Sequence, residues 1–160
     1  MHRALLALAI FVVAAAANAQ TVMRFGGGVG EVTIPSHYAR ASGKTPGLVV
    51  VSTPEGNVRL YFDLHRLDGA QAETYMRDLA KANGGQVRKR GEKLVLFQPG
   101  PHGSEDGRAM LRLHWQIGFG ETLVAMSAYV PAEAREAPDV KRFTAGDLDA
   151  IVDSLRRVGG

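Results

Sequence analysis

The stretch VRLYFDLH, residues 58–65, alternates apolar and polar side chains without interruption. Because successive side chains of a strand point to opposite sides of its sheet, this period of two predicts a strand with one buried and one exposed face. The stretch AMLRLHWQIG, residues 109–118, has the same period. The predicted apolar faces consist of Val58, Leu60, Phe62 and Leu64 in the first strand and Leu111, Leu113, Trp115 and Ile117 in the second.

Turns and further strands surround these two stretches. The apolar run LVVVS, residues 48–52, is followed by the turn-forming TPEGN, so with residues 58–65 it predicts a hairpin. We predict further strands at residues 30–34, 86–90, 93–98 and 122–130. Since hairpins dominate this order, the sheet should be mostly antiparallel, with about six or seven strands.

Two segments with apolar side chains at helical spacing predict helices at residues 70–83 and 145–158. Asp68 and Thr144 are the expected N-caps. Arg156 and Arg157 are expected in the last turn of the second helix, where they suit the negative end of its dipole. Residues 35–47 and 131–143 are left as connections. The predicted fold class is α+β, a sheet whose apolar surface is sealed beneath both helices.

The N-terminus has the composition of a secretory signal peptide. A basic start with Arg3 precedes the apolar run ALLALAIFVVAAAA, and Ala17-Asn18-Ala19 forms a small-residue cleavage site. The apolar run is shorter than the roughly 20 residues that span a bilayer, and no later segment is longer. We therefore predict a signal peptide at residues 1–19 and a single mature domain at residues 20–160, located in the periplasm or secreted.

Charge and composition exclude several classes of function. Removal of residues 1–19 takes away Arg3 and leaves a net charge of about +2, too little to favour nucleic-acid binding. The chain has no cysteine, which excludes thiolate metal sites, cysteine nucleophiles and a lipid-modified N-terminus. No cofactor motif is complete: the glycines of RFGGGVGEVTIP precede a predicted strand, whereas nucleotide loops precede a helix. SGKT, residues 42–45, lacks the first glycine of a phosphate-binding loop.

Three other groups of residues allow a chemical and a plain interpretation. His65 and His114 would both lie on polar strand faces, where they would form part of a metal site or simply be solvated. Ser104 has His102, Glu105 and Asp106 beside it, but neighbours in a loop rarely form a catalytic triad. The basic stretch VRKRGEK, residues 87–93, is either a site for an anionic partner or a solvated hairpin tip. We assign no catalytic or metal-binding residue.

The polar faces of the two alternating strands are the strongest candidate site. Arginine, tyrosine and histidine are residues that interfaces favour, because they combine contact area with directed hydrogen bonds. The alternative is an ordinary solvated face, or one hidden beneath a helix or loop. The predicted partner-binding face consists of Arg59, Tyr61, Asp63, His65, Arg112, His114 and Gln116.

Four stretches together resemble the PsbP-like and DcrB-like group of small exported domains. They are GEVTIPSHY at residues 30–38, TPEGNVRLYFDLHRLDG at 53–69, RAMLRLHWQIGFGETLVAMSAYVP at 108–131 and FTAGDLDAIVDSLRRV at 143–158. The resemblance implies an antiparallel sheet with helices packed against it and a mainly non-enzymatic, accessory role, and it carries no functional residue over. We expect a monomeric periplasmic domain that binds a protein partner in the cell envelope without a cofactor. The alternatives are a small-molecule or envelope-polymer binding module and, third, a hydrolase.

Overall fold

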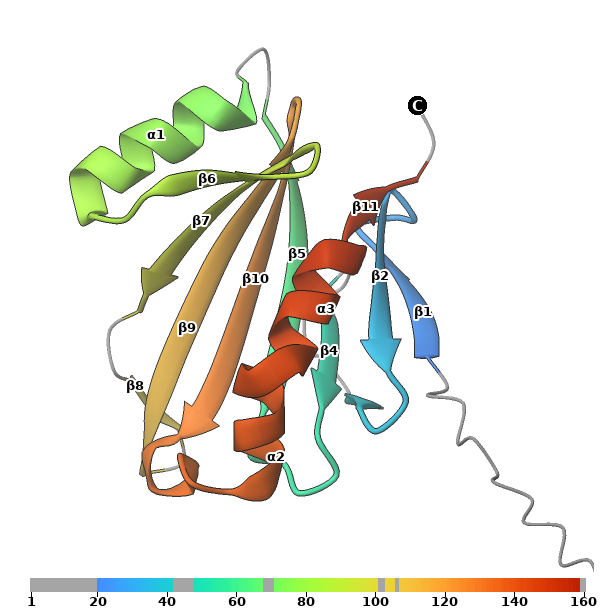
Figure 1. The fold of residues 1–160 in the computed structure, drawn as a ribbon, viewed down its shortest axis with the longest axis vertical. Helices are drawn as coiled ribbons and strands as arrows, with labels where there is room; N and C mark the ends of the chain where they lie inside the picture. Colours follow the sequence, from blue (N-terminus) through green and yellow to red (C-terminus); the bar gives the residue numbers. More distant parts are fainter. Residues whose placement is uncertain (1–19, 42–47, 68–70, 101–102, 106, 159–160) are drawn as a thin grey trace, which may run out of the picture.

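The computed structural model describes residues 20–41, 48–67, 71–100, 103–105 and 107–158 (Figure 1). The predicted signal peptide, the SGKT loop and Asp68 lie outside these ranges. None of the described helices combines the length and hydropathy of a membrane-spanning segment. The strands are β1 (Gln20–Phe25), β2 (Gly30–Pro35), β3 (Ala39–Ala41), β4 (Val49–Ser52), β5 (Arg59–Arg66), β6 (Val87–Arg90), β7 (Lys93–Pro99), β8 (Gly103–Glu105), β9 (Arg108–Phe119), β10 (Thr122–Pro131) and β11 (Arg156–Arg157). The helical elements are α1 (Ala72–Asn83), η1 (Ala132–Ala134), α2 (Pro138–Arg142), η2 (Phe143–Asp147) and α3 (Leu148–Ser154).

The predicted α+β class is confirmed, and the main sheet is larger than predicted. Eight described strands form it, in the order β3-β4-β5-β10-β9-β7-β6, with β8 paired to β9. A second sheet of three strands, β1-β2-β11, stands beside it. Each pairing between described strands is antiparallel. The extra strands β1, β3 and β8 fall in stretches that we expected to be irregular.

The predicted alternation of β5 and β9 divides the main sheet into an apolar and a polar face. Leu60 and Phe62 have no exposed surface, and Trp115 is 6% exposed. These side chains belong to one continuous core with the apolar residues of β2, β10 and the C-terminal helix, including Ile151 and Leu155. Figure 1 shows α2 and α3 crossing in front of the large sheet, next to β1 and β2. This layer and the three-stranded sheet therefore cover the apolar face.

Only one of the two helices covers the face that we predicted. α1 packs at one end of the opposite face, where Ala72 and Met76 form a separate buried cluster with Leu96 and Leu123. The close approach is possible because β9 has Gly118 at this point: an added Cβ would stand 2.9 Å from the Ala72 Cβ. The apolar stripe of α1 correctly predicted that it packs, but not on which side of the sheet.

The C-terminal helix differs from its predicted bounds at both ends. It begins at Pro138, within the expected connection, and continues through α2, η2 and α3 to Ser154. Thr144 is therefore inside the helix and is no N-cap, and its hydroxyl donates to the carbonyls of Val140 and Lys141. Proline at the first helical position has no amide proton to leave unpaired, so it starts this helix well.

Arg156 and Arg157 form β11 instead of the last helical turn. β11 pairs with β2, and the Arg156 guanidinium binds the buried carboxylate of Glu31, with an Nε–Oε1 distance of 2.7 Å. This hydrogen bond, supported by Arg24, holds the pKa of Glu31 below its usual value although burial opposes it. A buried carboxylate destabilises the folded state unless a charged group pairs with it. The pairing of Arg156 with Glu31 therefore favours β11 over a further helical turn.

The glycine-rich loop is a hairpin turn between β1 and β2. Gly26, Gly27 and Gly28 all have positive φ angles, of 58°, 69° and 91°. Glycine adopts this left-handed conformation without the steric strain that a Cβ would cause. We had predicted a flexible segment here that leads into the first strand. That prediction missed β1, because its pairing with β2 cannot be recognised from the local sequence pattern.

Asp139 connects the start of α2 to the turn between β4 and β5. Its buried carboxylate accepts hydrogen bonds from the Thr53 hydroxyl at 2.7 Å and from the Asn57 amide at 3.1 Å. Burial alone would raise the pKa of Asp139, but these hydrogen bonds outweigh it and the pKa is lowered. The predicted TPEGN turn is thus fixed by a residue more than eighty positions away.

Candidate functional site

The registers of β5, β10 and β9 bring all of the predicted site residues onto one face. β10 lies between the other two strands and pairs with both. It adds Ser127 and Tyr129, which the sequence analysis missed although they are the polar alternate positions of a mainly apolar strand. The resulting polar sheet face consists of Arg59, Tyr61, Asp63 and His65 of β5, Ser127 and Tyr129 of β10, and Arg112, His114 and Gln116 of β9.

The polar sheet face is hollowed. The first hollow has a volume of about 340 Å³. It is lined by Leu48, Tyr61, Asp63, His65, Arg112, His114, Gln116, Ala125, Ser127 and Tyr129, so Arg59 is the one predicted residue outside it. A second hollow of about 310 Å³ shares Tyr61 and Tyr129 with the first and also touches Ser104 and Met110. The two tyrosines therefore stand between two adjoining depressions.

Tyr61, Tyr129 and Arg112 form a stacked group at the centre of this surface. The two tyrosine rings meet edge to face, with centroids 5.2 Å apart. The guanidinium carbon of Arg112 lies 5.8 Å from the Tyr129 ring centroid, within the range of a cation–π contact. The Nε atom of Arg112 is buried and has no hydrogen-bond partner in the part of the chain that the structure describes. Packing thus positions this arginine, while one of its donors stays unused.

His114 is the centre of a short hydrogen-bonded row. Its Nδ1 lies 2.7 Å from the Ser127 hydroxyl, and its Nε2 lies 2.6 Å from the Gln116 amide nitrogen. Burial, and then the charge of Arg112, lower the pKa of His114 below its usual value. With the Gln116 amide in this orientation, its nitrogen can only donate, so Nε2 is the acceptor and the proton on Nδ1 is donated to Ser127. Gln116 is 8% exposed, and its Oε1 has no hydrogen-bond partner among the described residues.

The Ser127–His114 contact resembles a nucleophile and its base only in part. In a catalytic triad a carboxylate orients the ring and stabilises the imidazolium, whereas here the far nitrogen faces Gln116. The carboxylate on this face, Asp63, instead lies 3.3 Å from His65. Over the described ranges, no three histidine or acidic side chains are grouped so that they could hold a metal ion.

The other sequence candidates lie apart from this row. Ser104 belongs to β8, at the edge of the second hollow, while His102 and Asp106 lie outside the described residues. His65 and His114 are on the same face, with β10 between their strands. The basic stretch at residues 87–93 forms β6, its turn and the first residue of β7.

Comparison with known proteins bears on the fold. No family model matches the chain, and no curated protein matches its sequence. Among solved structures, the chain is similar to a protein of Bacteroides thetaiotaomicron VPI-5482, with a TM-score of 0.64, 14% identity and 88% of this chain covered. The match covers 48% of that protein, so this chain spans about half of its length. A likeness at this identity shows a shared fold.

The expected PsbP-like resemblance also has a counterpart among solved structures. The chain is similar to the cyanobacterial PsbP (CyanoP) from Synechocystis sp. PCC 6803, with 12% identity over 91% of this chain and 96% of that one. The TM-score of this match is 0.40.

Proposed function

We propose that this chain is an exported, non-enzymatic accessory domain that binds a protein partner through the polar sheet face. The observation that carries the proposal is the stacked group of Tyr61, Tyr129 and Arg112, which lies between two hollows of this face. Among the described residues, Arg112 Nε and Gln116 Oε1 are also buried without a hydrogen-bond partner, and a partner whose binding rearranged these side chains would recover the roughly 1–3 kcal/mol that each such atom costs. Tyrosine and arginine, which surround these atoms, are also the residues most enriched at the energetic centres of interfaces.

The geometry defines what the partner should offer. Arg112 Nε requires an acceptor, such as a carboxylate or a backbone carbonyl, and Gln116 Oε1 requires a donor. An extended peptide segment carries both groups on its backbone. The two hollows beside Tyr61 and Tyr129, of about 340 and 310 Å³, are large enough for side chains of such a segment. Because the Tyr61 and Tyr129 rings already pack edge to face, little of their side-chain freedom remains to be lost on binding.

Export is the second part of the proposal and depends on residues 1–19. The basic, apolar and small-residue segments occur in the order that a signal peptidase recognises. Mass spectrometry of the secreted or periplasmic protein tests this: the expected N-terminus is Gln20, and retention of residues 1–19 would contradict it.

Quantitative affinity capture tests the partner-binding face. The bait is the mature chain, as wild type, as the variant Tyr61→Ala/Arg112→Ala, and as the control Tyr75→Ala/Arg77→Ala. The control removes the same two residue types from α1, where Tyr75 is 44% exposed. We expect the wild-type bait to capture one protein in at least tenfold greater amount than the first variant does, and the control variant to capture as much of it as wild type. Equal capture by both variants would overturn the proposal.

A further inference from the structure

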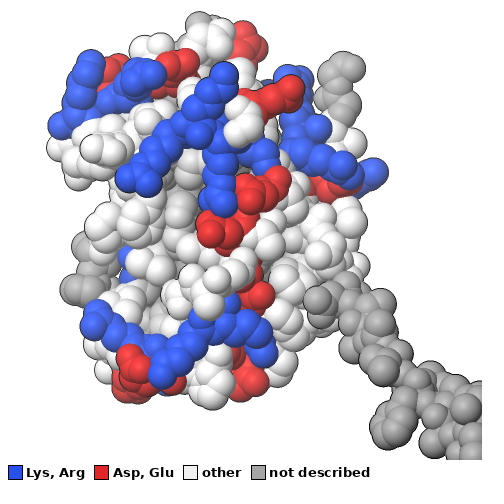
Figure 2. All heavy atoms as spheres, viewed as in Figure 1, with Lys and Arg blue, Asp and Glu red and all other residues white. Residues whose placement is uncertain are grey.

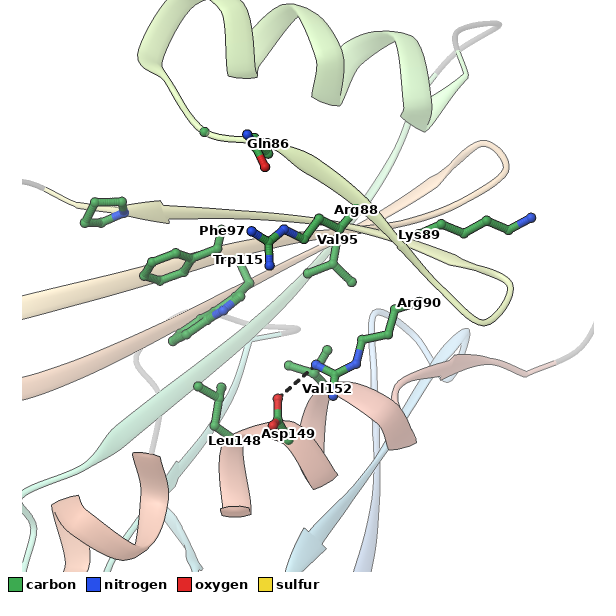
Figure 3. A pocket seen from close by; sticks show the side chains of 12 residues that line it. Gln86, Arg88, Lys89, Arg90, Val95, Phe97, Trp115, Leu148, Asp149 and Val152 are labelled. Atoms are coloured by element: carbon green, nitrogen blue, oxygen red, sulfur yellow. Dashed lines mark hydrogen bonds and ion pairs between the residues drawn. The ribbon is translucent and has the colours of Figure 1, made fainter. Parts of the chain in front are cut away.

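A cleft on the opposite side of the sheet carries a separate inference. It lies between the β6–β7 hairpin and α3 and has a volume of about 570 Å³ (Figure 3). Ligand sites for small molecules run from roughly 300 to 1,000 Å³. Its lining is formed by Gly85, Gln86, Arg88, Lys89, Arg90, Val95, Phe97, Pro99, Trp115, Leu148, Asp149 and Val152. None of these residues belongs to the polar sheet face.

The floor of this aromatic cleft is apolar and partly open. Phe97 and Trp115 are paired across β7 and β9, with ring centroids 5.2 Å apart. Trp115 is 6% exposed, whereas Phe97 is 42% exposed and is one of the few large apolar side chains on the described surface. Leu148 and Val152 of α3 form the facing wall. An apolar body placed between these walls would cover the exposed Phe97 ring and gain its burial.

The two arginines above the cleft differ in their partners. Arg90 is bound by Asp149 at 2.9 Å and by Asp153 at 2.7 Å, so its charge is balanced by α3. In the described part of the chain, no ion pair involves Arg88. Figure 3 shows the Arg88 side chain pointing toward Phe97 and Trp115. The space-filling view in Figure 2 likewise shows basic residues gathered around the β6–β7 hairpin, next to the acidic residues of α3.

Strand alternation explains why the Arg88 side chain points into the cleft and the Lys89 side chain does not. Arg88 stands opposite Val95 in the β6–β7 register, and Val95 and Phe97 are on the same face of β7. Lys89 is one residue further along β6, so its side chain projects to the other side of the sheet. Figure 3 shows it pointing away from the aromatic pair.

We propose that the aromatic cleft binds a small anionic amphiphile. Its apolar or aromatic body would lie against Phe97, Trp115 and Leu148, and its single negative group, a carboxylate or sulfonate, would pair with Arg88. Charge complementarity decides the class of ligand, since α3 balances Arg90 but, among the described residues, forms no ion pair with Arg88. This site is independent of the polar sheet face, so either proposal can fail without the other.

The experiment uses two fluorescent naphthalene probes that differ in charge. Anilinonaphthalene sulfonate carries one negative charge, and phenylnaphthylamine is its uncharged counterpart. Trp115 is the only tryptophan of the chain, so energy transfer from it reports a bound probe, and the variants below place that probe in the cleft. We expect saturable binding of the sulfonate with quenching of Trp115, and binding of the neutral probe weaker by about tenfold.

Three variants then test the residues. Arg88→Gln should lower the affinity for the sulfonate by about tenfold and leave the affinity for the neutral probe unchanged. Arg135→Gln, which removes the same charge from an exposed position that does not line the cleft, should change neither. Phe97→Ala should weaken the binding of both probes, and its exposed position keeps the fold intact, which near-UV circular dichroism verifies. Absence of saturable binding, equal affinity of the two probes, or equal effects of Arg88→Gln and Arg135→Gln would each overturn the proposal.

Discussion

Gly118→Ala should destabilise the protein, because α1 lies directly on this position of β9. A Cβ at Gly118 would stand 2.9 Å from the Ala72 Cβ and 2.9 Å from the Met76 Sδ. Unstrained contacts between such atoms are about 3.5–4.0 Å, so α1 or the Met76 side chain must move by roughly 0.5–1 Å. Ala72 is 1% exposed and Met76 has no exposed surface, which leaves little room for that movement. Overpacking of this kind costs about 1–3 kcal/mol.

The same substitution at Gly146 provides the control with the opposite sign. Gly146 lies in the helical segment η2, and an added Cβ would meet nothing within 4 Å. Alanine there restricts the unfolded chain without strain and should raise the free energy of unfolding by about 0.4–1 kcal/mol. The assay is urea denaturation followed by far-UV circular dichroism. With an m-value of about 2 kcal/mol/M, the Gly118→Ala midpoint should fall by roughly 0.5–1.5 M. A Gly118→Ala protein as stable as wild type would refute the close packing of α1 against β9.

Three further predictions concern the core, the half-buried His114 and the buried Asp139. Phe62→Ala should cost about 3–5 kcal/mol, because Phe62 is fully buried; a thermal midpoint within a few degrees of wild type would contradict this. Burial lowers the pKa of His114, so the stability it contributes is complete above its unfolded pKa, about 6.5, and is lost as the pH falls toward the lower folded pKa. Between pH 7.5 and 5.5 the urea midpoint of His114→Gln should therefore fall less than that of wild type, and parallel curves would exclude the effect. The pKa of Asp139 is also lowered, so its contribution should be lost progressively as the pH falls below its unfolded pKa, about 3.9; Asp139→Asn should be less stable at pH 7 but lose less than wild type between pH 5 and 3, as urea unfolding would measure.

The main sheet and the candidate face could be predicted because both follow from a local rule. The period of two in β5 and β9 fixes which side chains share a face, whatever strand lies between them. β10 lies between β5 and β9 and adds Tyr129 to the polar face. Tyr129 and Ser127 alternate along this strand, but most of their neighbours are apolar, so the pattern was not recognised as a polar face. Leu60 and Phe62 were placed in the core for the same reason.

The errors concern contacts between residues far apart in the sequence. The helical pattern continued through Arg156, but pairing with Glu31, 125 residues away, ended the helix earlier. The amphipathic pattern of α1 predicts that one side of the helix is buried. It does not predict which face of the sheet α1 packs against, which depends on the space above Gly118 in the folded chain. The aromatic cleft was missed because Phe97, Arg88 and Leu148 meet only in the folded chain.

Site-specific photo-cross-linking in the native host tests the central claim most directly. A benzophenone amino acid would replace Tyr129 on the polar sheet face and, in separate proteins, Tyr75 on α1 and Phe97 in the aromatic cleft. We expect a covalent adduct with one protein from position 129 and none with that protein from positions 75 and 97. Adducts of equal yield from all three positions, or no protein adduct from position 129, would contradict the assignment of the polar sheet face as the partner surface.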